Sequence, residues 1–559
     1  MPLKSHLVRE ISRLRISSAE AVENAASFSS LKKYLHVERS IQSKVEDILK
    51  KRLNEKGSNL ILLCGSVGDG KSHLLAYLNE EKKELMSKFT IINDATESYD
   101  PNKTSLETLE ELLRDFSDEN LKKTNEKIII AINLGVLHNF VNYEQHKYNF
   151  QILNKFINDS GIFTSNIMTH KQDENFDLVS FSDYQMFELT NEGVQAIYLE
   201  KLIERVCSEN ADNPFHSAYK RDQSLKIDSI IHQNYSFLCD STVRKQIIHL
   251  VVKTMIQYNL KLSTRHFLNF IADILMPNNE ELIQINSEHT LPNLLFNSQD
   301  RSQILNVIQK LKPTHTRSKL IDDLLISLNT HSNIEKLIEA KFSNNIAKTW
   351  LLQIDNNGVN KELDSFSEKF ISLLYLTDCT FSKNLECNDY REFTKLLYGL
   401  NCGNDQVIYE FRKYIKNAIY EWNRYPKSKK AYVYFKQLES DLAIAQNLKL
   451  AIDKNIYTKH DEVYLETFKP YLFIAFKKGN KQVTLEINYT LFRLLNKVCK
   501  GYRPNKLDEN HAATWLDFLE KIMKFGDKQE EILLSFLNEG RHYILKSEDE
   551  DALIFEEVE

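Results

Sequence analysis

The chain of 559 residues is poor in residues that break helices and in residues that cross-link chains. Glycine (14) and proline (9) are scarce, which favours helices over tight turns. The seven cysteines are scattered and contain no C-x-x-C pair, so neither a disulfide framework nor a zinc site is indicated. No apolar run approaches the ~20 residues that a membrane-spanning helix requires. We therefore expect a helix-rich protein without membrane segments.

The N-terminus and the charge balance exclude further classes. The N-terminal sequence MPLKSHLVREISRL lacks the apolar core of a secretory signal, so we expect a cytoplasmic location. The formal net charge is −6, so a contact with nucleic acid requires a local basic patch or a partner. At this length we expect several domains rather than one core.

The most informative stretch is 59–78, NLILLCGSVGDGKSHLLAYL. It places G-x-x-x-x-G-K-S between an apolar run and a helical pattern, which is the context of a phosphate-binding P-loop. Backbone N–H groups of such a loop and the dipole of the following helix favour anions. Lys71 would reach the β- and γ-phosphates of ATP, and the Ser72 hydroxyl would bind Mg²⁺. The predicted nucleotide-binding residues are Gly65, Ser66, Val67, Gly68, Asp69, Gly70, Lys71 and Ser72.

Strands alternate with helices up to residue 190, which is typical of a parallel α/β sheet. The expected strands are 60–64, 89–95, 127–132 and 176–182, and the first helices are 71–79 and 105–121. Because ligands of such sheets bind at the carboxyl ends of the strands, the polar residues after each strand would share one crevice. These residues are 66–72, Asp94, Asn133, Ser182 and Asp183.

The carboxylates needed for ATP hydrolysis are not in their usual place. The strand at 127–132 is followed by Asn133 and Leu134 rather than by an Asp and a Glu, which makes an atypical Walker B motif. Asp94 or Glu97 after the second strand could replace them, as could Asp183 after the fourth, although an Asp in such a position is often only a helix cap. We expect slow or partner-dependent hydrolysis, and no nuclease motif is visible. The candidate catalytic residues are Asp94, Glu97, Asn133 and Asp183.

Two arginines beyond the sheet are further candidates. Arg265, in LSTRHFLNFIADIL, resembles the arginine of the sensor-2 helix in the lid of AAA+ ATPases, which reaches the γ-phosphate. Arginine can bind phosphate oxygens with two parallel hydrogen bonds. A surface arginine beside a helix cap is the alternative interpretation. Arg244, in STVRKQ, is a weaker candidate for a finger directed at a neighbouring subunit.

The stretch 411–436, FRKYIKNAIYEWNRYPKSKKAYVYFK, is basic and aromatic, with Glu421 as its one acidic residue. Cations suit phosphates and aromatic rings stack on bases, so the stretch is a candidate nucleic-acid surface. A solvated helix pair with aromatic residues in the core is the alternative. The candidate contacts are Arg412, Lys413, Lys416, Arg424, Lys427, Lys429, Lys430 and Lys436.

The remaining sequence is predicted to be helical from a cap at Thr190 to about 455, and then α+β, with strand pairs at 469–487 and 541–559. The predicted fold class is an α/β P-loop NTPase core with an AAA+/ASCE-like parallel sheet, followed by a large helical region and a small α+β C-terminal domain. The expected divisions are an N-terminal helical segment (1–55), the core (56–190), a helical lid (191–300), a helical domain (301–455) and an α+β domain (456–559).

Six segments, taken in order, resemble the DptF family of DNA phosphorothioation-dependent restriction proteins, and the resemblance covers nearly the whole chain. It implies a bacterial defence role beside the subunits DptG and DptH, directed at DNA that lacks the phosphorothioate mark. It also implies ATP and Mg²⁺ at residues 65–72, and it implies that Asn133 is usual at its position. The segments are GSVGDGKSHLLAYL, INDATES, AINLGVLHNF, NPFHSAYK, STRHFLNFIADIL and GYRPNKLDENHA.

The leading expectation is an ATP-binding subunit of a multi-subunit restriction complex that meets DNA directly or through its partners. The alternatives are an autonomous AAA+-like ATPase motor and a nucleotide-binding scaffold without hydrolysis. ATP turnover by the chain alone and with its partners distinguishes the three.

Overall fold

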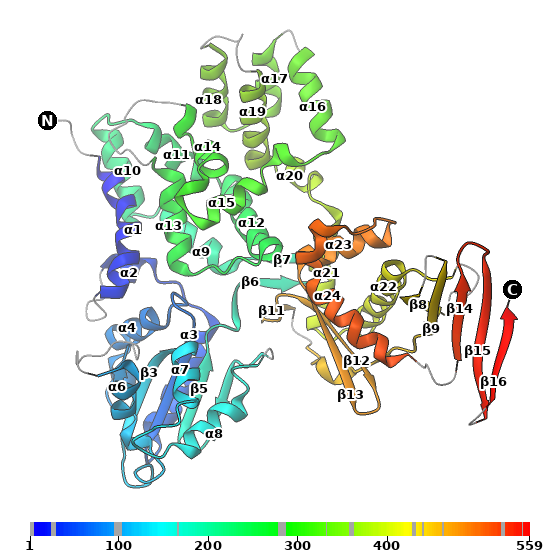
Figure 1. Ribbon diagram of the computed structural model, residues 1–559. Helices are drawn as coiled ribbons and strands as arrows, with labels where there is room; N and C mark the ends of the chain where they lie inside the picture. The colour runs from blue at the N-terminus through cyan, green and yellow to red at the C-terminus, as the bar shows by residue number, and fades with distance from the viewer. Residues whose placement is uncertain are drawn as a thin grey trace.

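The computed structural model describes residues 5–23, 30–93, 103–164, 167–277, 287–330, 333–356, 363–426, 432–438, 441–460, 463–526, 531–549 and 552–558. Figure 1 shows three parts: a lobe built on a sheet, a helical region beside it, and a C-terminal part that ends in a second large sheet.

The first lobe contains a five-stranded sheet in the order β2-β3-β1-β5-β4. Its first four strands are parallel, and the edge strand β4 is antiparallel to β5. This confirms an α/β sheet with parallel strands. The strands are β1 (Asn59–Gly65), β2 (Thr90–Ile92), β3 (Lys127–Asn133), β4 (His170–Gln172) and β5 (Phe176–Ser180).

Helices cover both faces of this sheet. Leu60 and Leu62 of β1 lie in a core with residues of α6, α7 and α8, whereas Ile61 and Leu63 lie in a second core with α3 and α4. Successive side chains of a strand point to opposite faces, so an unbroken apolar run suits a strand that is buried on both sides. The helices are α3 (Ser40–Asn54), α4 (Lys71–Glu81), α5 (Lys83–Met86), α6 (Ser105–Leu112), α7 (Leu134–Val141) and α8 (Gln151–Ser160).

The N-terminal segment is divided between two parts of the molecule. Whereas α3 packs on the sheet, α1 (His6–Glu23) and α2 (Ser30–Leu35) belong to the core of the helical region. Asp222 accepts hydrogen bonds from the backbone N–H groups of His6 (3.0 Å) and Leu7 (2.9 Å). These are donors that the first turn of a helix leaves without partners, so Asp222 fixes the start of α1.

The helical stretch runs from α9 to α22 and shares one large apolar core. Helices α9 to α20 lie together, whereas α21 and α22 lie in the C-terminal part (Figure 1). The helices are α9 (Ile197–Cys207), α10 (Pro214–Ser224), α11 (Ile230–Leu238), α12 (Ser241–Tyr258), α13 (Thr264–Leu275), α14 (Leu291–Asn297), α15 (Gln303–Lys310), α16 (Lys319–Thr330), α17 (Ile334–Lys341), α18 (Asn345–Asn356), α19 (Leu363–Thr377), α20 (Cys379–Asn384), α21 (Asn388–Asn401) and α22 (Asp405–Asn423).

The expected helix start at Thr190 is wrong. Thr190 ends strand β6 (Tyr184–Thr190), which forms a hairpin with β7 (Gly193–Gln195), and the helix begins at Ile197. Gly193 has a φ of 136°, a conformation that favours glycine, so its place in the sequence indicated a turn rather than a first helical turn. The strand β6 also pairs with β11 (Tyr464–Thr467), a partner that no local pattern around Thr190 reveals.

The expectation of helix up to 455 is also wrong. After α22 the chain forms β8 (Tyr432–Gln437), β9 (Leu442–Asn447) and β10 (Ala451–Ile452). The first two complete a sheet in the order β16-β15-β14-β9-β8, so they find their partner β14 (Glu531–Phe536) much later in the chain.

The two strand pairs expected near the C-terminus are confirmed. They are β12 (Leu472–Lys478) with β13 (Lys481–Ile487), and β15 (Arg541–Asp549) with β16 (Ala552–Val558). Two helices, α23 (Tyr489–Cys499) and α24 (Glu509–Ile522), lie between them. Their buried residues belong to the same apolar core as the helical region, whereas the last sheet has a small core of its own around Leu533.

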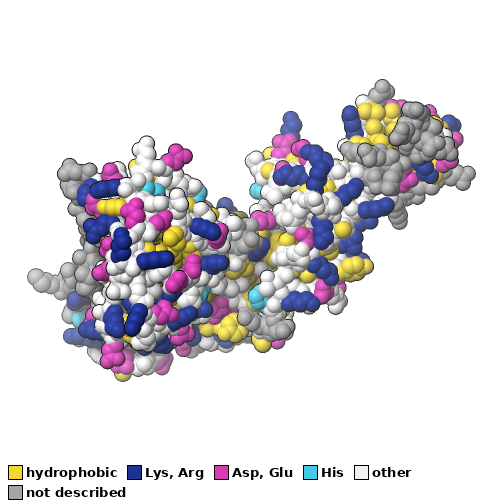
Figure 2. Space-filling view, turned by 90° about the horizontal axis from the view of Figure 1, so that it is seen from below, with side chains coloured by type: hydrophobic (Ala, Val, Ile, Leu, Met, Phe, Trp, Pro, Cys, Tyr) yellow, Lys and Arg dark blue, Asp and Glu magenta, His cyan; other side chains and the backbone are white. Residues whose placement is uncertain are grey.

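The surface differs between the two ends of the molecule. Seen from below, side chains of both signs mix over the first lobe, whereas Lys and Arg predominate over the C-terminal part (Figure 2). A hollow separates the two in this view (Figure 2). Among the described helices, none combines the length and the apolar character needed to cross a membrane.

Candidate functional site

The polar residues expected at one crevice follow strands whose ends are level. Gly65 at the end of β1 lies opposite Asn133 at the end of β3, and Cys64 lies opposite Ser180 at the end of β5. The residues after these strands therefore emerge at the same edge of the sheet, as parallel pairing requires. The segment after β1 is the glycine-rich loop, defined here as residues 65–70, which leads directly into α4.

Two glycines give this loop its shape. Gly68 and Gly70 have φ values of 87° and 95°, in the left-handed region where other residues are strained. Gly70 is the N-cap of α4, so the loop delivers the chain to the amino end of that helix. Lys71, the first residue of α4, is buried although it carries a charge.

Within the loop, a carboxylate occupies the backbone donor that points inward. The Ser66 N–H donates to Oδ2 of Asp69 at 2.5 Å, and the Ser182 hydroxyl donates to the same oxygen at 3.3 Å. The Lys71 ammonium donates to the Ser66 carbonyl at 2.6 Å. The loop is thus closed on itself by one anionic side chain and one cationic side chain, which are the two groups that an incoming phosphate would repel and attract.

The start of α13, in the helical region, contacts the loop at Gly68. Ser263, its buried N-cap, lies so close that a Cβ atom added to Gly68 would come within 2.9 Å of its side chain. Arg265 follows two residues later, and burial alone lowers the pKa of its guanidinium. No described residue forms a hydrogen bond or an ion pair with that guanidinium. The structure therefore brings Arg265 to the loop region on an element that touches Gly68.

Ser72 connects the loop to β2. Its hydroxyl donates to the backbone carbonyl of Asn93 at 3.2 Å, and Asn93 is the residue directly after β2. The side-chain oxygen of Asn93 is buried, with no hydrogen-bond partner among the described residues. Asp94 and Glu97, the carboxylate candidates that follow, lie outside the described residues.

The other two candidate catalytic residues have local partners. The Asn133 side chain accepts a hydrogen bond from the Gly135 N–H at 2.9 Å and thereby caps α7. Asp183 accepts from the Met168 N–H at 3.2 Å, and burial raises its pKa. Both therefore do at least the structural work of a cap or a loop anchor, and their catalytic roles stay predictions.

No sequence motif pointed to three side chains that lie near the loop, those of His36, Arg39 and His73. The Arg39 guanidinium donates to the Asp69 carbonyl at 3.5 Å and lies over the Tyr198 ring, 5.0 Å from its centroid. His36 and His73 stack and lie 3.1 Å apart at their ring nitrogens, and burial lowers the pKa of His73 to about 4. These residues come from the segment before β1, from α4 and from α9, so only the tertiary fold gathers them.

The candidate nucleic-acid stretch is mostly packed. Phe411 and Tyr420 are buried, and Trp422 contacts Trp515, so these aromatic rings belong to the core. Tyr409, just before the stretch, is 51% exposed, with the Lys413 ammonium over its ring. This arrangement fits the alternative interpretation for the aromatic residues.

The basic side chains of this stretch are spread over different surroundings. Arg412 donates to the Leu450 carbonyl at 2.6 Å, and the Lys416 ammonium lies 5.4 Å from the centre of the Tyr420 ring. Arg424 is exposed with a φ of 67°, and Lys436 is exposed on β8. Lys427, Lys429 and Lys430 lie outside the described residues.

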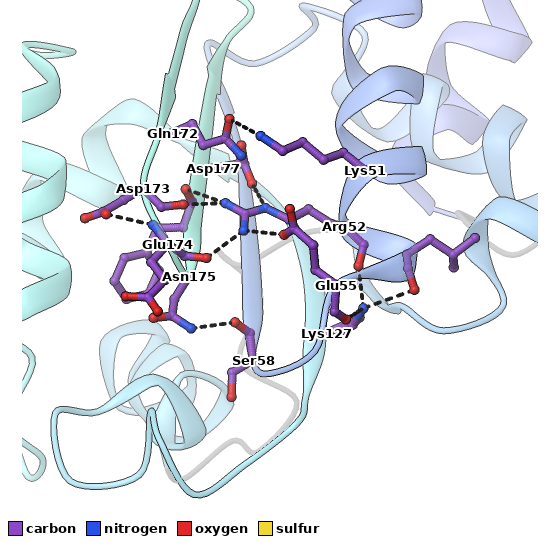
Figure 3. Close-up of polar contacts among 12 residues, drawn as sticks. Lys51, Arg52, Glu55, Ser58, Lys127, Gln172, Asp173, Glu174, Asn175 and Asp177 are labelled. Carbon is purple, nitrogen blue, oxygen red and sulfur yellow. Dashed lines mark hydrogen bonds and ion pairs between the residues drawn. The ribbon is translucent and has the colours of Figure 1, made fainter.

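A closed network of hydrogen bonds lies at the amino ends of the parallel strands, opposite the glycine-rich loop (Figure 3). All five N–H donors of Arg52 are used: they reach Asp177 (2.6 Å), Glu55 (2.7 Å) and the carbonyls of Asp173, Glu174 and Phe176. The Lys127 ammonium donates to the carbonyls of Arg52, Leu53 and Glu55 at the end of α3. This network ties α3 to β3 and β5 and so fixes the sheet that carries the loop.

Comparison with protein-family models found no match for the chain, and comparison with curated proteins found no significant match.

Proposed function

We propose that the chain is an ATP-binding subunit of a bacterial DNA phosphorothioation-dependent restriction complex, and that ATP–Mg²⁺ binds at residues 65–72 as in P-loop NTPases of the AAA+ type. One observation carries the nucleotide assignment: the glycine-rich loop joins a buried parallel strand to the amino end of α4, with Lys71 and Ser72 in its first turn. Such an end offers unpaired N–H groups and a favourable dipole to phosphates.

The surroundings fit a nucleotide triphosphate. Lys71 and Arg265 supply two cations from two different elements, and cations are the usual partners of the β- and γ-phosphates. The buried oxygen of Asn93 is a polar group next to Ser72 that needs a partner. Bound Mg²⁺ would neutralise phosphate charge, and Ser72 is the loop residue that would hold it.

We propose that the carboxylate that would bind Mg²⁺ belongs to Asp94, and that Asn133 does not have this role. Ser72 touches the backbone of Asn93, so the next residue in the chain is the acidic side chain nearest in sequence to that contact. Asn133 instead ends the strand directly beside β1, where a neutral polar side chain can donate to a phosphate oxygen. Glu97, three residues after Asp94, is the candidate for orienting the attacking water.

The assignment to a restriction complex with DptG and DptH depends on the sequence resemblance of the six segments. In that setting, ATP binding would drive assembly or a conformational change when the complex meets DNA without the phosphorothioate mark. The contact between α13 and the loop supports a coupling of ATP binding to a conformational change, because a ligand at Gly68 would alter the contact with Ser263.

Calorimetry with ATP and Mg²⁺ tests the nucleotide site. Lys71→Ala should weaken ATP binding by tenfold to a hundredfold or more, since a hydrogen bond to a charged group contributes about 1.5–3 kcal/mol. Lys83→Ala, an exposed change in the next helix, is the matched control and should bind ATP like the parent. Equal affinities for the parent and Lys71→Ala would refute the assignment of the loop.

ATP turnover then separates the three functions. A subunit of a complex should hydrolyse ATP slowly alone and faster with DptG and DptH. An autonomous motor would turn over alone at about 1 s⁻¹ or faster, which is ordinary for an enzyme. A scaffold would bind ATP and hydrolyse it in neither state.

A further inference from the structure

Helix α23 and the turn after it carry a row of cations with no acidic residue between them in sequence. Between 488 and 506 the chain has Arg493, Lys497, Lys500, Arg503 and Lys506 and no Asp or Glu. All five side chains are exposed. We call these five residues the α23 ridge. It lies outside the stretch 411–436, in a chain that is acidic overall.

The cations are not needed to hold α23 in place. The opposite face of the helix is buried, with Phe492, Leu495 and Val498 among the residues of the apolar core. Arg493, Lys497 and Lys500 follow one another at the spacing of a helical turn, so they share one face. Like charges at this spacing destabilise a helix, and the packing of the apolar face has to offset that effect.

Few acidic side chains lie near the ridge, and Asp508, which interacts electrostatically with Lys497, is one of them. Among the described residues, only Lys500 has an ion-pair partner, Asp389, at 4.0 Å. Lys497 lies over the Tyr502 ring, and Arg503 donates to the Glu421 carbonyl at 2.7 Å. The neighbouring helix differs, because α24 pairs Lys521 with Asp517 and Lys524 with Glu520 one turn away.

The positive surface continues beyond α23. Arg493 acts electrostatically on Tyr258 at the end of α12, and the Lys310 ammonium lies 5.5 Å from the centre of the Tyr258 ring. Tyr258 is 41% exposed. An aromatic face between two cations therefore adjoins one end of the α23 ridge, and it belongs to a different part of the chain.

We propose that the α23 ridge is a binding surface for the phosphate backbone of double-stranded DNA. Successive cations on one helical face lie about 5–6 Å apart, which allows each to reach a separate phosphate along a strand. Lysine binds phosphate as a compact point charge, and arginine adds directional donors. The proposal goes beyond the nucleotide site and does not depend on it.

Duplex DNA fits the ridge better than a membrane does. Binding to a lipid surface grows with the apolar area that enters it, in addition to the attraction between charges. The ridge contains no exposed apolar side chain between Arg493 and Lys506, and Leu507 alone follows it. The binding energy must therefore be electrostatic, as it is for non-specific DNA contacts.

The test uses the full chain without nucleotide and a fluorescent 20-base-pair duplex, with anisotropy measured from 50 to 200 mM salt. The triple variant Arg493→Gln, Lys497→Gln, Lys506→Gln leaves unchanged Lys500, which has an ion pair, and Arg503, which donates to a backbone carbonyl. It should bind at least tenfold more weakly at 50 mM salt. Its plot of log affinity against log salt should be flatter by about two to three units, since each phosphate contact contributes about 0.9.

A matched control removes the same charge from paired lysines of the same C-terminal part: Lys454→Gln, Lys521→Gln, Lys524→Gln. This control should bind the duplex like the parent, and Lys71→Ala should also bind it normally. Equal loss in both triple variants would reduce the effect to net charge and overturn the proposal. It would also be overturned by a parent that does not bind the duplex at 50 mM salt, or by one that binds anionic phosphatidylserine vesicles or a poly-glutamate peptide more tightly than the duplex.

Discussion

The parallel sheet has an amino edge, where the amino ends of its strands lie, and a carboxyl edge, where their carboxyl ends lie. The two edges differ in how their charged side chains are paired. At the amino edge, Arg52 is 2% exposed and each of its donors has a partner. At the carboxyl edge, the Lys71 ammonium donates to a loop carbonyl, and Arg265 forms no ion pair with any described residue. Arg52 at the first edge therefore has all its partners within the protein, whereas Arg265 at the second edge has none among the described residues.

The difference has a physical reason. Removing a charge from water is expensive, and only a full set of hydrogen bonds and an opposite charge compensates for it. Arg52 meets this condition through Asp177, so its network serves to hold α3 against the sheet. Arg265 does not meet it among the described residues, which is the state expected of a group whose partner is a ligand.

The largest effect is expected at the amino edge. Arg52→Ala should lower the free energy of unfolding by about 3–5 kcal/mol, because it leaves the Asp177 carboxylate buried without its cation. Denaturant titration gives the value. Lys50→Ala, which removes an exposed pair with Asp47 on the same helix, should cost no more than about 1 kcal/mol. If both variants are equally stable, the amino edge is not the anchor described here.

At the carboxyl edge, Arg265→Ala should weaken ATP binding about tenfold or more while leaving the free energy of unfolding nearly unchanged. The loss should be larger for ATP than for ADP, since the proposed contact is with the γ-phosphate. Arg244→Ala is the control, because that guanidinium donates to the Cys239 carbonyl of its own region. Equal losses for ATP and ADP would move Arg265 away from the γ-phosphate.

A gain of affinity is expected at Asp69. Its carboxylate holds the Ser66 N–H and places a negative charge where phosphate would bind. Asp69→Asn should tighten ATP binding severalfold, which corresponds to about 1 kcal/mol for one unit charge in a hydrated site. Calorimetry at two salt concentrations checks it, because the gain should shrink as salt rises. Weaker binding would instead mean that Asp69 holds the loop in its binding shape.

The smallest effect concerns His73, whose pKa burial lowers from 6.5 to about 4. Between these two values the unfolded chain takes up a proton that the folded protein does not, so the stability falls as the pH is lowered through this window. His36 and Lys32 add to the effect, since both are positive when protonated.

His73→Gln should therefore lose less stability than the parent between pH 6.5 and 4, by about 1 kcal/mol after allowance for partial exposure. His138→Gln, on the exposed side of α7, is the control. Parallel curves of unfolding free energy against pH for the parent and His73→Gln would contradict this account. Glu188 titrates in the same range with the opposite sign, because burial raises its pKa to about 7, so the comparison has to be made as a difference between variants.

Much of the first lobe could be predicted from its sequence. The runs at 60–64, 127–132 and 176–182 are apolar enough to be strands buried on both faces, and the structure places strands there. The left-handed glycines of the loop also follow from the motif. The helices predicted around Thr190 and at 432–452 were wrong, because these segments form strands that pair with β11 and β14 from far along the chain.

The sequence by itself determined the order of the elements in the first lobe, the loop at 65–70 and the cations of the α23 ridge, because periodicity, glycine and charge act locally. The tertiary structure alone decided which groups meet. It brought Ser263 and Arg265 of α13 to Gly68, set Ser72 against Asn93, and closed the network of Arg52. Such contacts depend on packing between segments far apart in the chain. The free energy of that packing depends on both segments together, so neither segment predicts it alone.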